Sequence, residues 1–291
     1  MRAAVVAVTL MGGAACVLGC QQSSDPPPSY VAGLRVLAIK AEPPDVAPGG
    51  TSTVTALAID GDGTTPSASW SRCTRPPLAG QAVNPDCISI TGAVNANLVP
   101  VGQGLAVTAT MPADATPAAL GAPDATGGVY LPLIADVSVP TDHITASYRL
   151  RLTSGDPAGS PPNANPKIAG VFVDGAGGQT ALDEATPLVV HAGDQITLSA
   201  TFAPGSVESY TTSLPNGSGG VTTTSSTETL DVAWFATGGE LTNDQTSDVQ
   251  PETVLKLDKQ LPAAGSTIDL YAVGRDERGG TDWVHRTLHL E

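Results

Sequence analysis

Two histidines near the C-terminus have a spacing that could serve metal binding. His285 and His289 are four residues apart, and on a helix both imidazoles would share one face and could bind one zinc ion. The surrounding sequence DWVHRTLHL instead alternates apolar and polar residues, which is typical of a β-strand. Residues of a strand rise by about 3.3 Å each, which separates the two side chains by about 13 Å. We therefore expect exposed strand residues and no metal site.

Two further stretches begin like ligand-binding motifs. DGDG at 60–63 starts like a calcium loop, but Thr65 stands where that loop needs glycine and Ser71 where it needs glutamate. DGAGGQT at 174–180 starts like a dinucleotide loop, but Thr180 replaces the third glycine and no helix is predicted to follow. We expect a hairpin turn at the first stretch and a turn at the second.

Cys73 and Cys87 offer thiol chemistry or a covalent link. Neither has an evident histidine partner for nucleophilic catalysis, and no histidine lies between residues 60 and 100. A metal site would need more soft ligands nearby, and two reduced thiols are the other alternative. We expect a disulfide, because closing a loop of about 15 residues would stabilise the fold by about 3 kcal/mol.

The N-terminus predicts export. Arg2 is followed by the uncharged segment AAVVAVTLMGGAACVLG, which is typical of a secretory signal peptide spanning residues 1–19. A compartment that permits disulfides would follow from export. Residues 20–33 are polar and rich in proline and serine, and we expect a semi-rigid tether there.

The sequence VLGC at 17–20 resembles the lipobox of bacterial lipoproteins, in which the signal peptide is cut before a lipidated cysteine. The resemblance implies that Cys20 becomes the mature N-terminus and carries acyl chains. About two chains are needed for stable anchoring in a membrane. The alternative is an ordinary signal peptide with an incidental cysteine.

Charge and composition exclude several classes of function. The chain of 291 residues has 13 Lys and Arg against 28 Asp and Glu, a net charge of −15, which argues against binding to nucleic acid or to anionic lipid headgroups. Aromatic residues make up only 4%, whereas 32 glycines and 25 prolines favour short strands joined by many turns. No sequence motif indicates a catalytic residue or a cofactor, so we expect a protein that is not an enzyme.

The elements that would carry any site are predicted to be strands. QITLSATF at 195–202 places Ile196, Leu198, Ala200 and Phe202 on one face, and SYRLRLT and LDVAW alternate in the same way. Such alternation is typical of antiparallel sheets with one buried face.

The chain also repeats once. A turn followed by a strand (46–59 and 190–202), a strand with a central tryptophan and a closing hairpin occur in each half. We expect two immunoglobulin-like sandwiches at 34–153 and 167–291, joined by a Gly/Pro/Asn-rich linker at 154–166. Trp70 and Trp234 are predicted to fill the space between the sheets.

Two segments and three aromatic residues are candidates for a binding surface. Residues 203–229 form a long Ser/Thr/Gly-rich segment, whose composition favours disorder, although a functional loop is the alternative. RDERGGTDW at 275–283 is predicted to be a hairpin turn. Tyr210, Tyr271 and Trp283 are the aromatic residues that could bind a sugar if they are exposed.

Together, VLGC, the Pro-rich tether, VAWFATGG and YAVGRDERGGTDW resemble envelope lipoproteins of the myxobacterial type. Those proteins carry tandem immunoglobulin-like or PKD-like sandwiches and mostly lack an assigned activity. The resemblance implies a lipoprotein anchored to the outer membrane, on its periplasmic or its surface face.

Two functions remain open from the sequence. The first is a structural or protein-binding component of the cell envelope, which would contact an envelope protein through exposed strand edges or through residues 203–229. The second is a carbohydrate-binding or adhesive surface module that would use the three aromatic residues on a polysaccharide. Neither function needs a metal or a cofactor.

Overall fold

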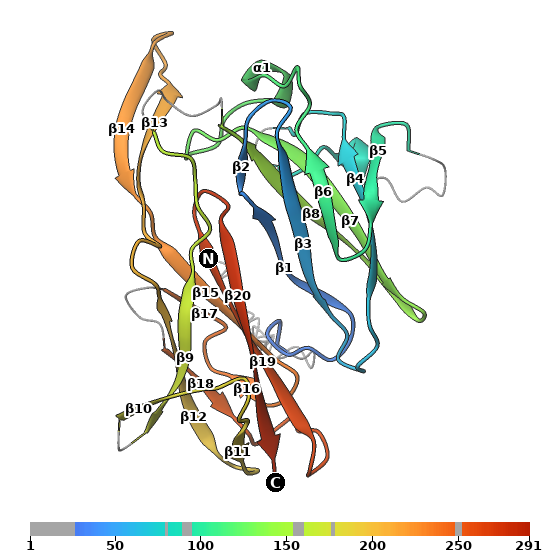
Figure 1. The fold of residues 1–291 in the computed structure, drawn as a ribbon, viewed down its shortest axis with the longest axis vertical. Helices are drawn as coiled ribbons and strands as arrows, with labels where there is room; N and C mark the ends of the chain where they lie inside the picture. The colour runs from blue at the N-terminus through green and yellow to red at the C-terminus, as the bar shows by residue number, and fades with distance from the viewer. Residues whose placement is uncertain (1–26, 79–80, 89–94, 154–159, 176–177, 248–251) are drawn as a thin grey trace, which may run out of the picture.

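The computed structural model describes residues 27–78, 81–88, 95–153, 160–175, 178–247 and 252–291, and in these residues the fold is all-β (Figure 1). Two short helical segments accompany the strands, the 3-10 helix η1 (Pro85–Cys87) and the single-turn helix α1 (Pro117–Leu120). The strands form two β-sandwiches, which confirms the predicted fold class.

The first sandwich packs a sheet with the order β1-β3-β6 against a sheet with the order β2-β8-β7-β4-β5. Its strands are β1 (Arg35–Glu42), β2 (Asp45–Val46), β3 (Thr51–Ile59), β4 (Ser67–Cys73), β5 (Leu98–Gln103), β6 (Ala106–Thr110), β7 (Tyr130–Val139) and β8 (Asp142–Leu152). All pairs are antiparallel except β2 with β8, which is parallel.

The second sandwich packs a sheet with the order β10-β9-β12-β18-β16 against a sheet with the order β11-β20-β19-β15-β17. Its strands are β9 (Ile168–Gly175), β10 (Gly178–Ala181), β11 (Leu188–Val190), β12 (Gln195–Phe202), β15 (Leu230–Ala236), β16 (Glu240–Leu241), β17 (Gln245–Ser247), β18 (Glu252–Lys256), β19 (Thr267–Asp276) and β20 (Thr281–Leu290). A separate two-stranded sheet is formed by β13 (Ser209–Pro215) and β14 (Val221–Thr227).

The two sandwiches share one topology. The first strand pairs with the next long strand, β1 with β3 and β9 with β12. The short strand between them pairs in parallel with the last strand, β2 with β8 and β11 with β20. The last two strands, β7–β8 and β19–β20, form a hairpin beside the strand that carries the tryptophan, β4 or β15. Strands A, B and E of an immunoglobulin fold make one such sheet, and strands C, F and G make the other. Both halves of the chain are therefore immunoglobulin-like, as the repeat in the sequence predicts.

The sequence alternation explains the two cores. Trp70 and Trp234 are 1% and 0% exposed and lie between the sheets of their own sandwich. Their indole N–H groups donate to Gly104 O and to Thr246 Oγ1, each at 2.9 Å. Burying the large ring without losing this hydrogen bond is what makes tryptophan suitable at the centre of a sandwich.

The predicted turns are present, with one difference. The 174–180 stretch joins β9 to β10, and the 275–283 stretch joins β19 to β20, as expected. DGDG at 60–63 is also a turn, in which Gly63 N–H donates to Asp60 O at 2.9 Å. It is not a hairpin turn, because it carries the chain from β3 in one sheet to β4 in the other.

Two segments are more ordered than their composition suggests. The 203–229 segment, for which disorder was the favoured prediction, contains the β13–β14 hairpin. The end of the predicted tether also packs against the second sandwich, because Tyr30 bridges to Ala236 and Val31 is only 1% exposed. Ser29, Tyr30 and Val31 at the end of the predicted tether are therefore packed on the folded part of the chain.

Candidate functional site at the domain junction and the β13–β14 hairpin

The turn between β19 and β20 places an arginine at the junction of the two sandwiches. Asp276 Oδ1 accepts the backbone N–H groups of Arg278 and Gly280, each at 2.8 Å, and Gly279 has a φ of +101°, which favours glycine. The turn directs the Arg278 side chain inward, where the residue is 1% exposed. Arg278 is therefore buried although it lies in a turn that is rich in charged residues.

The Arg278 guanidinium contacts the base of the β13–β14 hairpin, the first sandwich and the segment between the two sandwiches. Its Nη1 lies 3.3 Å from Glu228 Oε1 and 3.7 Å from Glu208 Oε2, the residues at the base of the β13–β14 hairpin. Its Nη2 lies 3.9 Å from Asp45 Oδ2 of the first sandwich and donates to Pro161 O at 2.9 Å. A buried guanidinium with several oxygen partners stabilises one relative placement of these parts, because any other placement would leave the charge without partners.

The buried network continues into the first sandwich. Asp45 Oδ2 lies 3.7 Å from Nε of Arg151, a residue only 2% exposed, and accepts the Asn163 N–H at 2.8 Å. The Asn163 amide in turn donates to Asp276 Oδ2 at 3.3 Å. Asn163 belongs to the segment between the sandwiches, so this segment is bound into the junction at that point.

Burial changes the protonation of the acids in this network. Burial is the largest cause that raises the pKa of Glu228 to about 7, and the nearby Asp276 carboxylate raises it further. The Glu208 N–H and the Arg278 guanidinium act in the opposite direction. Burial also raises the pKa of Asp276, although hydrogen bonds from Gly280 and Asn163 partly offset this effect. With a pKa of about 7, Glu228 is partly protonated at neutral pH.

An apolar contact accompanies the charged network. Ala38 of β1 packs with Ala233 of β15 and Val273 of β19, all at most 5% exposed. Beside it, Leu37 packs with Tyr271 of β19. The outer face of the first sheet of domain 1 thus lies directly on the second sheet of domain 2, as the neighbouring β1 and β20 ribbons show (Figure 1).

The same contact covers the free edge of β1. Arg275 Nη2 donates to Leu37 O at 2.7 Å, and Asn165 Nδ2 donates to Ala41 O at 2.8 Å. β1 pairs with β3 on its other side. An edge strand whose carbonyls accept hydrogen bonds from side chains is protected against pairing with another strand.

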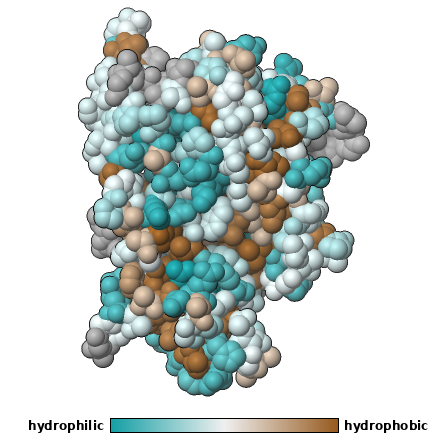
Figure 2. Space-filling view, viewed as in Figure 1, coloured by the Kyte–Doolittle hydropathy of each residue, from teal (hydrophilic) through white to brown (hydrophobic). Residues whose placement is uncertain are grey.

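The β13–β14 hairpin projects from this junction. Its strands pair over seven residues without a register shift, and Asn216 Oδ1 in the connecting turn accepts the N–H groups of Ser218 and Gly220. β13 faces the body of the protein, where Tyr210 and Thr212 are buried and Tyr210 OH donates to Glu277 at 2.6 Å. β14 lies on the outer side, and the hairpin is largely pale in Figure 2, between hydrophilic and hydrophobic.

The three predicted sugar-binding aromatics are not available as platforms. Tyr210 and Tyr271 are each 6% exposed, and the Tyr271 ring stacks on His285 with centroids 4.7 Å apart. Trp283 is half-buried, with Lys40 Nζ 4.7 Å from the centre of its ring. The condition of exposure is not met. The contact between the two sandwiches covers Tyr271 and Trp283, whereas Glu277 and the Arg278 guanidinium, 4.9 Å from the centre of its ring, cover Tyr210. The sequence of one sandwich gives no sign of these contacts.

The histidines lie on β20, as the strand prediction requires. His285 is partly buried rather than exposed, and its Nε2 lies 2.7 Å from Asp269 Oδ1. His289 pairs with Thr267 across the β19–β20 ladder. His285 is therefore part of the structural contacts of this sheet.

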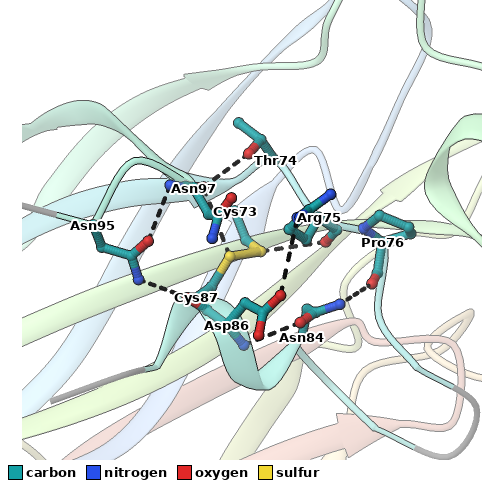
Figure 3. Close-up of a disulfide and its surroundings, with 9 residues drawn as sticks. All are labelled: Cys73, Thr74, Arg75, Pro76, Asn84, Asp86, Cys87, Asn95 and Asn97. Carbon is teal, nitrogen blue, oxygen red and sulfur yellow. Dashed lines mark hydrogen bonds and ion pairs between the residues drawn. A yellow bond between two sulfur atoms is a disulfide. The ribbon is translucent and has the colours of Figure 1, made fainter. Parts of the chain in front are cut away.

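Cys73 and Cys87 form the predicted disulfide (Figure 3), with their Cα atoms 5.8 Å apart. Asn84 caps η1 by accepting the Asp86 N–H and donates to Pro76 O at 2.8 Å. The disulfide packs on Ile134 of β7 and so fastens the loop after β4 to the outer face of the sheet. It is structural and has no exposed thiol chemistry.

Two grooves that share Tyr130 and Arg149 lie beside the first sandwich, and the first of them is also lined by Arg275 of the second sandwich. One of about 350 Å³ is lined by Val36, Tyr148 and Arg149 among others, and one of about 530 Å³ also includes Arg149. The Arg149 guanidinium lies 4.3 Å from the centre of the Tyr130 ring and 3.7 Å from Asp124 Oδ2. Arg149 thus covers the aromatic face that a sugar would need.

Cys20 lies outside the described residues. Within the described part of the chain, no helix is long and apolar enough to cross a membrane.

Sequence reasoning missed Asp45, Arg151, Glu228 and Arg278, since a buried ion network has no local pattern. It also missed the hairpin, for which a signal was present. Thr-rich runs with high β-propensity flank the turn sequence NGSGG, which is a hairpin pattern.

No protein family model and no curated protein matches the sequence. Among solved structures, a chimeric titin Z1Z2 carrying an exogenous peptide from decorin is 14% identical over 88% of this chain and 98% of that chain, with a TM-score of 0.20. Extracellular domains 3–5 of Drosophila OTK are 7% identical over 88% of this chain and 63% of that chain, with a TM-score of 0.22. Domains 4 and 5 of the S-layer protein SbsC are 11% identical over 90% of this chain and 98% of that chain, with a TM-score of 0.19. Likenesses this low do not assign a family, and the immunoglobulin-like description rests on the strand order of the chain itself.

Proposed function

We propose that this protein is a non-enzymatic lipoprotein of the cell envelope, anchored to the outer membrane through acyl chains on Cys20, and that it binds an envelope protein through the β13–β14 hairpin. The observation that carries the proposal is the free outer edge of β14. Among the described strands only β13 pairs with it. Main-chain groups on such an edge can pair with a strand of another protein.

The domain junction supports this role. The base of the hairpin is attached to Arg278 through Glu208 and Glu228, and the same arginine contacts Asp45 of the first sandwich. The hairpin is therefore held at a fixed position on a two-domain body. A binding element with a fixed position loses less conformational entropy on association than a mobile loop does.

The carbohydrate-binding alternative loses its main support in this structure. Tyr210 and Tyr271 are buried, and Trp283 is covered by Lys40. Sugar recognition of the kind expected from the sequence would need at least one exposed ring face.

Co-purification from gently solubilised envelopes tests the proposal. The tagged full chain is compared with a variant in which residues 213–223 are replaced by Asn-Gly, which keeps the buried Tyr210 and Thr212 while removing the turn and the first three of the seven residues of β14. We expect a stoichiometric protein with the parent chain and its loss with the shortened hairpin. An unchanged set of bound proteins, with an untagged copy of the chain counted among them and both chains folded, would show that the hairpin is not the binding element.

A Cys20→Ala variant tests the anchor in the same experiment. We expect the parent chain in the membrane fraction, with an acylated N-terminal cysteine detected by mass spectrometry, and the variant outside it. A parent chain that begins elsewhere or carries no lipid would contradict the anchoring part of the proposal.

A further inference from the structure

The hydrogen-bond pattern of the hairpin determines which groups of β14 are free. Glu228 N–H donates to Glu208 O, and Asn216 N–H donates to Gly220 O, each at 2.9 Å. In an antiparallel ladder hydrogen-bonded pairs alternate with non-hydrogen-bonded pairs, so the residues bonded to β13 are the even-numbered ones. The N–H and C=O groups of Val221, Thr223, Ser225 and Thr227 therefore point away from β13.

This edge lacks the features that protect strand edges. The seven residues of β14, VTTTSST, include no charge and no proline, and the ladder with β13 has no bulge. Elsewhere in the molecule the comparable edge of β1 is covered by Arg275 and Asn165. An uncharged and regular edge that no described residue covers is a template for pairing with another strand. A two-stranded sheet also gains stability when further strands extend it.

We propose that the occupant of this edge is β14 of a second copy of the chain, paired antiparallel about Thr224 so that the two hairpins form one four-stranded sheet. The inference rests on the proposed function and specifies the partner that the hairpin binds.

The sequence of the strand argues for a second copy. Pairing about Thr224 places Val221 opposite Thr227 of the second copy and Thr223 opposite Ser225 of the second copy. Both are odd-numbered pairs, so the free groups of the two strands meet in register. Hydroxyl pairs of this kind are already present within the hairpin, between Ser213 and Thr223 at 3.2 Å and between Ser209 and Thr227 at 3.4 Å.

Charge also favours this occupant on this surface. Two chains with a net charge of −15 each repel one another, and a self-contact needs a surface free of carboxylates. The strands β13 and β14 carry no ionisable side chain except Tyr210. The same neutrality offers nothing that would select a charged partner. In Figure 1 β14 lies at the outer margin of the molecule, with β13 between it and the first sandwich, so a second hairpin can approach from the open side.

Disulfide cross-linking of the full chain in envelopes tests the proposal. In the proposed pair Thr224 faces Thr224 of the second copy at a non-hydrogen-bonded position, where Cα atoms are about 4.5 Å apart, within the range of a disulfide. We expect Thr224→Cys to give a covalent dimer on a non-reducing gel. Thr222→Cys is the matched control, because the two introduced cysteines would be about 13 Å apart. The parent chain reports any background from Cys20.

A charge test in the Thr224→Cys background checks the register. Thr223→Lys with Ser225→Lys places like charges opposite each other in the dimer, whereas Thr223→Lys with Ser225→Glu places opposite charges there. We expect the first pair of substitutions to reduce cross-linking several-fold and the second to retain it. Both variants lose the Ser213–Thr223 hydroxyl pair equally and keep the main-chain groups that bond to β13, and circular dichroism checks that each is folded.

The outcomes separate this inference from the proposed function. Equal cross-linking at positions 222 and 224, or equal loss in both charge variants, would overturn the pairing about Thr224. A Thr224→Cys adduct with a different protein, or no dimer while a co-purified partner still depends on the hairpin, would overturn the second copy as occupant and leave the proposed function intact. A specific dimer without any other hairpin-dependent partner would support the inference and make the second copy the bound protein.

Discussion

At the scale of single residues, the ion pair of Arg278 and Glu228 stabilises the junction of the two sandwiches. Both are buried, and they lie 3.3 Å apart where the hairpin, the interdomain segment and both sandwiches meet. A buried charge is costly unless its partners stay in place. The arginine and its carboxylates therefore specify one arrangement of the junction, and the titration of Glu228 makes that arrangement sensitive to pH.

Replacing Glu228 by glutamine should reduce the pH dependence of stability. The pKa of Glu228 is raised in the folded protein to about 7, from an ordinary value of 4.5. The folded state thus holds this proton more tightly than the unfolded chain does. The stability that Glu228 contributes is complete below about pH 4.5 and is lost as the pH rises through about 7.

Melting temperatures of the full chain between pH 5 and pH 8 check this prediction. We expect the parent protein to lose stability over this interval and Glu228→Gln to lose less. Glu240→Gln is the control, because Glu240 makes its ion pair with Lys259 at the surface. The prediction would be contradicted by the same slope in the parent chain and in Glu228→Gln.

At the scale of elements, the edge of β1 is covered by side chains and the outer edge of β14 is not covered by described residues. Arg275 and Asn165 cover the edge of β1, whereas the described residues leave the outer edge of β14 to solvent. The Cys73–Cys87 disulfide is a third device at this scale, because it holds a loop against Ile134 of β7. These features lie outside the sandwich cores, and each determines which part of a strand or sheet remains exposed.

Removing the disulfide should destabilise the first sandwich more than the second. Replacing both Cys73 and Cys87 by serine opens a loop with a sequence separation of 14, and the chain-entropy estimate for such a loop is about 3 kcal/mol. Urea titration with peptide-resolved hydrogen exchange reports each sandwich separately. We expect faster exchange in β4 and β7, and a smaller change in β12 and β15. Equal destabilisation of both sandwiches would mean that the loop is not a local constraint.

At the scale of the whole molecule, the two sandwiches contact each other through both apolar and charged side chains. Ala38, Ala233 and Val273 form an apolar patch, and Lys40 Nζ lies 3.2 Å from Asp282 Oδ1. This contact covers Tyr271 and Trp283 and thereby removes them from the outer surface.

A charge placed in this apolar patch should separate the sandwiches. Ala38→Glu would bury a carboxylate without a designed partner, which costs several kcal/mol unless the interface opens. We expect faster hydrogen exchange in β1 and β19 and a shift of Trp283 fluorescence towards that of an exposed indole. Ala106→Glu is the matched control, because Ala106 is exposed on β6 of the same sheet as β1. An unchanged Trp283 signal in Ala38→Glu would show that the patch does not hold the domains together.

The sequence by itself determined the local structure. Period-2 alternation predicted β12, β15 and the closing hairpins, and the internal repeat predicted two sandwiches with Trp70 and Trp234 at their centres. The Cys73–Cys87 disulfide followed from cysteine number and context. These features depend on residues close in sequence, whose side-chain pattern directly reflects which face of a strand is buried.

Only the tertiary structure decided which surfaces remain free. Tyr210, Tyr271 and Trp283 look available in the sequence, yet contacts with residues far along the chain cover them. Arg151 occupies a position that alternation assigns to solvent, but it is 2% exposed because Asp45 and the junction meet it there. The physical reason is that docking of two sandwiches buries outer faces, and outer faces carry no periodic signal that distinguishes water from another domain.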